Sequence, residues 1–443
     1  KYSIMIRLRI IHLLLLIPVC TVFAQENTLS KEDAIALALK NNFGVIIAKN
    51  NLKIADNNKN ILNSGYLPSL TGNAGGSFDQ SNQEATFQDG SVRAIDGAET
   101  TRYNASLNLN YTLFDGLGRW YDYKRLKEEY GLSELETRET IETTMIQLYT
   151  VYFEVARLTE NIKVLEDTFS NTQKRLQRSE YSFEYGQTNK LDVLNAQVDL
   201  VNDSINLMNT RQTFRNTKRD LNLLLNRDLA SSFEVDTVIA FVNPISLEEF
   251  LDKGIANNVS VLQTEKNIKI NDYAYKSSKS VFLPTVGLTG SYGWNEGNFP
   301  ATNFLASSVS TGISAGLNLT WNLFDGGNSI TQIKNAKIVL DNQETIKEQI
   351  EQQVLRDVQN AKENYLNRLQ VFSLQEQNVV TNQNNFERSN EQFQLGSITS
   401  IELRQAQINL LNAQTNKNLA KYDAKLAELQ LLQLTGQLLN IEL

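Results

Sequence analysis

The sequence contains the same landmarks twice, and this duplication limits what the chain can fold into. Leu-Pro occurs at 67–68 and again at 283–284, and Leu-Phe-Asp-Gly occurs at 113–116 and again at 323–326. The offset is 216 residues for the first pair and 210 for the second, so the only length change falls between these landmarks. Such a period is too long for a solenoid unit. It indicates duplication of a whole domain and predicts a pseudo-twofold repeat.

The first 24 residues have the pattern of a secretory signal peptide. Basic residues precede an apolar run at 10–19, and Val-Phe-Ala at 22–24 forms a cleavage site before Gln25. We therefore predict a signal peptide at 1–24, a first repeat at 25–244 and a second at 245–443. The apolar run is too short to span a bilayer, and no other segment approaches 18 unbroken apolar residues. Any membrane insertion is therefore expected to use β-strands.

Composition disfavours catalysis. Cys20 and His12, the only cysteine and the only histidine, both lie in the predicted signal. Cys20 could be a lipidation site, but Val19 precedes it where a small residue is preferred. The mature chain then lacks thiol chemistry and histidine-based acid–base or metal sites. Three of the 42 basic residues and none of the 50 acidic residues lie in the predicted signal, so the mature chain has a net charge of −11. This negative charge disfavours binding to nucleic acid. We expect neither an enzyme nor a cofactor.

Two stretches predict very long helices. Residues 118–186 contain one internal glycine and no proline, and residues between 327 and 396 contain neither, so each helix would be about 100 Å long. Apolar residues from Ile141 to Phe169 and from Leu191 to Met208 recur every three or four positions, which predicts coiled-coil packing. Gly186 and Gly396 are expected to end the long helices, and a shorter helix then returns, the first over about 189–226.

A further helix is expected before each pair of strands, over 30–66 and 246–282. Each begins with a capping box, at Ser30/Asp33 and Ser246/Glu249. Leu-Pro ends each helix, because the residue before proline avoids the α region. Together with the returning helix, each of these segments would match one long helix in length.

Strict alternation follows at 104–113 and 312–323, with one apolar and one small polar face. Weaker partner strands are expected from Ser69 and Thr285, with polar loops near 82–100 and 295–310. A soluble sandwich fits this alternation. Uncharged polar faces and aromatic residues near the strand ends instead fit a transmembrane barrel. The aromatic residues are Tyr103, Tyr111, Trp120, Trp294, Trp321 and Phe324.

Four strands cannot close a barrel, because the smallest barrels use eight and open edges are forbidden in lipid. The chain must therefore assemble with copies of itself. We expect an α+β membrane protein in which three chains form a trimeric 12-stranded β-barrel, with four strands per chain, continued by a long α-helical barrel.

In the order of these landmarks the chain resembles the TolC-type outer-membrane efflux protein family, from about Thr28 to Leu439. The resemblance rests on the duplication, the Leu-Pro and Leu-Phe-Asp-Gly joints, and the tips at 185–188 and 395–399. It implies a homotrimer in outer-membrane lipid, with helices projecting through the periplasm. It also implies docking of the tips to a periplasmic adaptor (membrane fusion protein) of an inner-membrane pump. We expect a passive exit duct for efflux or type I secretion. The alternative is a soluble periplasmic coiled-coil scaffold or adaptor.

The tips carry the candidate site residues. Asp192 and Glu402 each lie six residues after a tip glycine, where relatives can carry acidic residues around the entrance. Both also occupy N3 positions after Asn189 and Thr399, so helix capping is an equal alternative. Asn195 and Gln405 stand where relatives can carry a second acid, and Arg404 could tie the closed tips together. Adaptor contacts are expected at eight residues, although chain reversal alone could explain them: Gly186, Gln187, Thr188, Asn189, Gly396, Ser397, Ile398 and Thr399.

Overall fold

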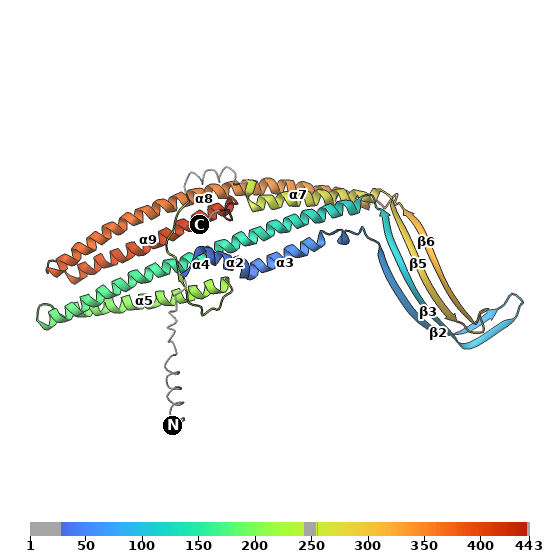
Figure 1. The fold of residues 1–443 in the computed structure, drawn as a ribbon, viewed down its shortest axis with the longest axis horizontal. Coiled ribbons are helices and arrows are strands. Elements are labelled where there is room, and N and C mark those ends of the chain that lie inside the picture. Colours follow the sequence, from blue (N-terminus) through green and yellow to red (C-terminus); the bar gives the residue numbers. More distant parts are fainter. Residues whose placement is uncertain (1–27, 243–253, 255, 441–443) are drawn as a thin grey trace, which may run out of the picture.

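The computed structural model describes residues 28–242, 254 and 256–440. The predicted signal peptide and the capping box at Ser246/Glu249 lie outside these residues. The chain is elongated, with the strands gathered at one end and the helical hairpins at the other (Figure 1). None of the described helices is long and apolar enough to cross a membrane.

The same order of elements occurs twice. The first set is α2 (Lys31–Asn41), α3 (Phe43–Asn58), η1 (Ile61–Asn63), β2 (Ser69–Thr86), β3 (Val92–Phe114), α4 (Gly118–Glu184) and α5 (Lys190–Leu224). The second set is α7 (Val259–Ser278), η2 (Lys279–Phe282), β5 (Thr285–Asn298), β6 (Ser307–Thr320), α8 (Asn328–Gln394) and α9 (Ser400–Leu434). Helices α4 and α8 each contain 67 residues, and α5 and α9 each contain 35. The two predicted long helices and their shorter returning partners are therefore confirmed.

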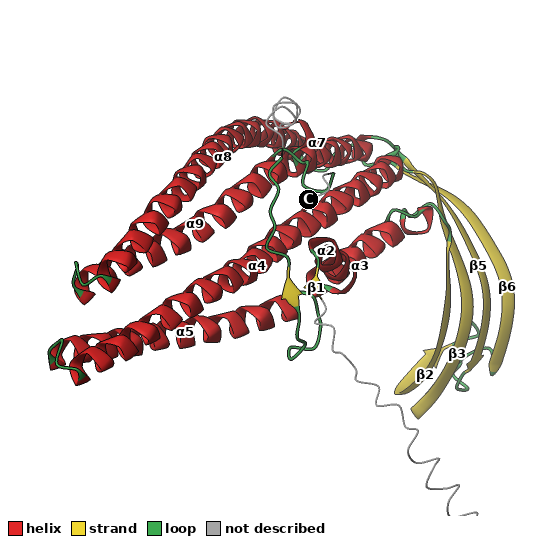
Figure 2. Ribbon diagram, turned by 60° about the vertical axis from the view of Figure 1, so that its left-hand side comes forward, coloured by secondary structure: helices red, strands yellow, loops and turns green. Residues whose placement is uncertain are grey.

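Shorter helices follow one another along each long helix. Helix α5 packs on the tip half of α4, whereas α3 and α7 pack on its sheet half (Figures 1 and 2). Helix α8 likewise packs on α9 and α7. The predicted single helix over 30–66 is wrong, because the chain breaks between α2 and α3 at Asn42 and leaves the helix after Asn58.

An asparagine starts the sheet-side helix in both halves. The Asn42 side chain accepts hydrogen bonds from the Gly44 and Val45 backbone and donates to the Leu224 carbonyl at 3.0 Å. Asn258 caps α7 in the same way and donates to the Leu434 carbonyl at 2.9 Å. Each asparagine thus joins the end of the returning helix to the start of the sheet-side helix of the same half.

The Leu-Phe-Asp-Gly joints turn a strand into a helix. Asp115 accepts a hydrogen bond from the Arg119 backbone at 3.0 Å, and Asp325 accepts one from the Ser329 backbone at 2.8 Å. These carboxylates satisfy backbone donors that have no partner within the helix. At Gly116, where φ is +69°, a Cβ would lie 2.6 Å from the Ser280 carbonyl oxygen, so close approach also requires glycine.

The four long strands form one antiparallel sheet in the order β2-β3-β5-β6. The β3–β5 pairing joins the two halves. The first hairpin is longer than predicted, because pairing continues to Thr86 opposite Val92, whereas β3 pairs with β5 only as far as Thr101 opposite Asn298. Most of the expected loop at 82–100 is therefore strand. Its polar composition weakens the alternation, but the two strands stay paired on both sides of an irregularity between Ser81 and Gln83.

The apolar core lies midway along α4. Tyr149, Tyr152, Phe153 and Tyr422 pack together there, joining α4 to α9. The Tyr152 hydroxyl donates to the Leu29 carbonyl at 2.8 Å and accepts from the backbone N–H of Asp236 at 3.0 Å. These contacts attach two short parallel strands, β1 (Thr28–Leu29) and β4 (Glu234–Val235), to the outside of the core (Figure 2).

One predicted apolar stripe does not pack within the chain. The α4 stripe is buried from Met145 to Leu158, as predicted. On α5, by contrast, the side that meets α4 includes Val193, Ala196 and Leu207. The predicted α5 seam is exposed, and its six residues are Leu191, Leu194, Val198, Val201, Ile205 and Met208. The heptad spacing is real, but this face has no partner in a single chain.

Candidate functional site

The two hairpin tips share one backbone design. Gly186 and Gly396 have φ angles of +73° and +77°, the left-handed conformation expected after a helix C-terminus. The backbone N–H of Gln187 donates to the Ser182 carbonyl at 2.7 Å, and that of Ser397 donates to the Gln392 carbonyl at 2.9 Å. These bonds satisfy carbonyls left free at the end of α4 and α8.

Both tip carboxylates take part in helix caps. The Asn189 side chain accepts from the Asp192 backbone at 3.2 Å, and the Thr188 hydroxyl donates to the Asp192 carboxylate. At the second tip Thr399 and Glu402 form a full capping box. Glu402 accepts from the Thr399 backbone at 2.8 Å and from its hydroxyl, and these bonds lower the pKa of the Glu402 carboxyl. Capping therefore occurs at both positions, and both carboxylates lie at the hairpin tips.

The other predicted entrance residues lie differently. Gln405 is exposed and bonds along its own helix, with its amide 2.9 Å from Asn409 Oδ1. Asn195 is half-buried. Arg404 instead points across to the first hairpin, and this places it at the centre of a buried polar network.

Arg404 joins the two hairpins through Asp203. Its Nη1 and Nη2 atoms lie 2.8 Å and 2.7 Å from the two oxygens of that carboxylate, a bidentate arrangement. The Asp203 side chain is only 3% exposed, and it also accepts from the Thr172 hydroxyl at 2.7 Å. Gln407 donates to the same hydroxyl at 3.0 Å. Two helices of the first hairpin are thus bonded to α9 of the second.

A second arginine strengthens this link. Arg175 of α4 pairs with Asp199 of α5 and donates to the Ser400 carbonyl at 3.1 Å, at the start of α9. Asp199 also lies 3.5 Å from Arg404 Nε. Burial lowers the pKa of the Arg175 guanidinium, which Asp199 partly offsets. Two arginines and two aspartates therefore neutralise one another between the hairpins. We call Arg175, Asp199, Asp203 and Arg404 the tip latch.

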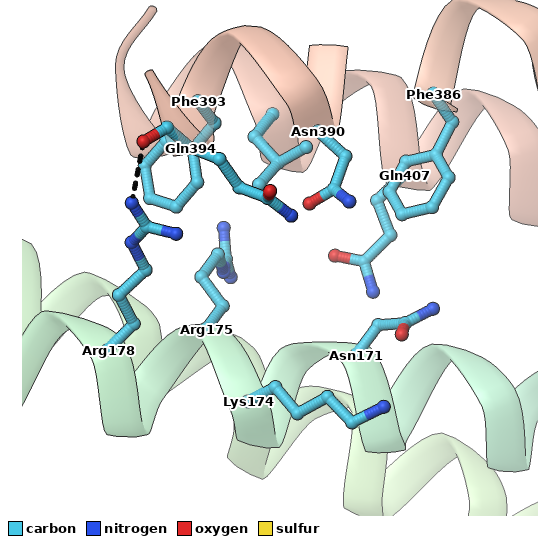
Figure 3. A pocket seen from close by; sticks show the side chains of 10 residues that line it. Asn171, Lys174, Arg175, Arg178, Phe386, Asn390, Phe393, Gln394 and Gln407 are labelled. Carbon is cyan, nitrogen blue, oxygen red and sulfur yellow. Dashed lines mark hydrogen bonds between the residues drawn. The ribbon is translucent and has the colours of Figure 1, made fainter. Parts of the chain in front are cut away.

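A cavity of about 410 Å³ lies beside the tip latch, between α4 and α8 (Figure 3). Its α4 side is basic, with Lys174, Arg175 and Arg178, and its α8 side carries Asn390 and Phe393. Arg178 donates to the Gln394 carbonyl at 2.9 Å, shown by the dashed line in Figure 3. The hairpins therefore meet here through polar bonds around a space rather than through close apolar packing.

Sequence reasoning identified Arg404 but missed its partners. The buried seam of α4 continues below Leu165 as Thr168, Thr172, Arg175 and Ser179. These polar residues keep the heptad spacing. A pattern of apolar residues alone therefore does not reveal that the buried seam continues here. Polar residues at seam positions were the available signal, because they are used in coiled coils to fix register and partner.

Comparison with known proteins identifies the family of the chain. The family model for the outer membrane efflux protein matches residues 34–227 and 250–437. The chain belongs to the outer membrane efflux protein family. It is an outer-membrane protein of the TolC type with its helical part in the periplasm, as the sequence predicts.

The relatives are distant in sequence. "Outer membrane protein TolC" of Vibrio cholerae is 22% identical over 343 residues, covering 77% of this chain and 78% of its own length. "Outer membrane efflux protein BepC" of Brucella suis is 20% identical over 405 residues, covering 91% of this chain and 85% of its own.

Solved channels share the fold over most of the chain. The Campylobacter jejuni CmeC outer membrane channel superposes with a TM-score of 0.75 at 18% identity, covering 92% of this chain and 86% of that one. The open state of the Neisseria gonorrhoeae MtrE outer membrane channel superposes with a TM-score of 0.70 at 16% identity, covering 92% of this chain and 89% of that one.

Proposed function

We propose that three copies of this chain form a closed duct across the outer membrane. The observation that carries the proposal is the open four-stranded sheet, in which β2 and β6 are edge strands. Backbone groups at an edge cannot remain unpaired in lipid. Pairing β2 of one copy with β6 of the next removes every edge, and three copies give a 12-stranded barrel.

Exposed apolar seams support the same assembly. The α5 seam has no partner in one chain, and α8 exposes Leu366, Leu374 and Val380 along its tip half. In a closed ring α5 of one copy lies beside α8 of the next, so each seam covers the other in a coiled coil. Three pairs of hairpins then continue the barrel as a helical tube.

The duct is proposed to conduct solutes passively, as the exit of a tripartite efflux or type I secretion system. A periplasmic adaptor binds at the tips, where Gly186–Asn189 and Gly396–Thr399 are the contact candidates, and an inner-membrane pump supplies the energy. Family membership favours this function over that of a periplasmic scaffold. The tip latch supports a closed resting state, because it joins the hairpins where they must separate to admit solute.

The decisive experiment is detergent extraction followed by recording in planar bilayers. The proposal requires an oligomer whose mass corresponds to three chains and which gives discrete single-channel currents. Recovery of the protein from the periplasm as a soluble monomer without conductance rejects it. Adaptor docking is tested separately by crosslinking through cysteine introduced at Gln187 or Ser397 in cells that express the adaptor.

A further inference from the structure

Aromatic rings and lysine side chains gather on α4 and α7 directly below the sheet. The Lys124 ammonium lies 5.0 Å from the Trp120 ring and 5.9 Å from the Tyr273 ring. Lys127 lies 4.3 Å from Tyr123, and Lys276 lies 5.5 Å from Tyr273. We call these six residues the aromatic–lysine patch.

The patch is locally positive in an acidic chain. Lys276 pairs with Asp272 at 2.6 Å, but neither Lys124 nor Lys127 forms an ion pair among the residues that the structure describes. The full chain carries a net charge of −8. Trp120 is 44% exposed and Lys127 is exposed as well. The Lys124 ammonium beside the Trp120 indole and the Lys127 ammonium beside the Tyr123 ring thus remain available to an external anion.

The patch lies on the face of α4 that is outside the proposed tube. Residues three or four positions apart lie on the same face of a helix. In this spacing Trp120, Lys124 and Lys127 share a face of α4 with Met145 and Tyr152. At Tyr152 this face is covered by a second layer, because the Tyr152 hydroxyl bonds to Leu29 of β1. A solute duct has no room for a second protein layer in its lumen, so the covered face is the outer one.

The height of the patch matches the lipid head groups. Helix α4 begins at Gly118, directly after the strand joint, so Trp120 and Lys124 lie about 3 Å and 9 Å along the axis. Head groups extend about 5–8 Å beyond the hydrocarbon on each side of a bilayer. Long lysine stems can rise toward that level while the rings remain at the boundary.

We propose that the aromatic–lysine patch binds the phosphate groups of anionic phospholipids in the periplasmic leaflet of the outer membrane. The proposal rests on the proposed function, since it needs the barrel to lie in the bilayer just above the patch. Lys124 and Lys127 supply the charge, and the rings of Trp120, Tyr123 and Tyr273 lie beside their ammonium groups. Each lysine near an anionic surface raises lipid affinity about fivefold.

Native mass spectrometry of the purified oligomer tests this binding. The protein is equilibrated in micelles with equal amounts of phosphatidylglycerol and phosphatidylcholine, and the retained lipids are counted. We expect phosphatidylglycerol to be preferred, and Lys124→Gln with Lys127→Gln to reduce the preference by about thirtyfold. Lys124→Arg with Lys127→Arg should keep it. The matched control is Lys163→Gln with Lys417→Gln, far from the sheet on α4 and α9, which should change nothing.

Conductance of the same preparations separates this proposal from the function. Absence of channels from the unaltered protein rejects the duct. A conducting protein that retains both lipids equally overturns the patch proposal alone. An unchanged lipid ratio in the double glutamine variant, with altered ion selectivity, would place the lysines in the lumen and also overturn it. The oligomer mass in each spectrum reports whether the variant has assembled.

Discussion

Removing Arg404 should open the duct. Arg404→Leu deletes both hydrogen bonds to Asp203 and leaves that carboxylate, 3% exposed, without its cation. Removing one partner of a buried ion pair costs about 3–5 kcal/mol. Thr172 still donates to Asp203, so we take about 3 kcal/mol as the loss. Once the hairpins separate, Asp203 is hydrated and the penalty disappears. In each of the three chains the ratio of the closed to the open conformation should therefore fall about 150-fold.

Single-channel recording reports the combined effect of the three chains as an increase in the fraction of time that the channel is open. The matched control is Arg211→Leu, whose partner Glu166 is 46% exposed and lies within the same hairpin. An exposed pair contributes about 0–1 kcal/mol, so the control should change the ratio by less than about fivefold. Adding Asp203→Leu to Arg404→Leu should recover part of the closed population, because no lone charge is then buried. If Arg404→Leu opens the duct no more than Arg211→Leu does, the tip latch does not hold it closed.

Four further predictions concern charge and backbone. Asp192→Asn with Glu402→Gln should reduce cation block and cation selectivity, and unchanged currents would leave capping as the only role of these carboxylates. The pKa of the Glu402 carboxyl is lowered in the folded chain, so ionised Glu402 stabilises the fold. This stabilisation is complete above the ordinary carboxyl range and is lost as the pH falls through the lowered pKa. Thermal melting at a series of pH values should show this loss for the unaltered protein and not for Glu402→Gln. Gly186→Ala should destabilise the first tip by about 1–2 kcal/mol through its positive φ alone, since nothing lies within 4 Å of the added Cβ, and faster proteolysis at that tip would report it. Glu428→Gln should cost about 3–5 kcal/mol in unfolding experiments because Lys425 is buried beside it. Glu428→Gln with Lys425→Met should cost less, because no lone charge is then buried and the amide oxygen can still accept from the Tyr365 hydroxyl.

The sequence predicts the long elements well because their signals are local. Glycine and proline are nearly absent from α4 and α8, and Gly186 and Gly396 end them with a conformation that other residues adopt poorly. Asn42 shows why the break between α2 and α3 was missed. Asparagine is tolerated within helices, and its role here depends on the Leu224 carbonyl, 182 positions away in the sequence.

The candidate site was predictable only in part, because some of its contacts are local in the sequence and others join residues far apart in it. Glycine tips and capping residues are read from neighbouring positions. The tip latch depends on pairs such as Asp203 and Arg404, which are separated by 201 positions and lie on different hairpins. Each of these residues taken alone looks like an exposed charge on a helix. Only the fold shows that they are buried together.

The position of the apolar core allows each hairpin to rotate about a point far from its tip. Tyr149, Tyr152 and Phe153 hold α4 firmly to α9, whereas below them the contact becomes polar, through Asn161 with Asn418 and then the tip latch. From Tyr152 to the end of α4 the arm is about 50 Å long at 1.5 Å per residue. A rotation of about 10° at the core would therefore carry a tip about 8 Å sideways. A small rotation at the apolar core therefore moves the tips a long way. A bond near the tips can prevent this rotation with less force than a bond near the core.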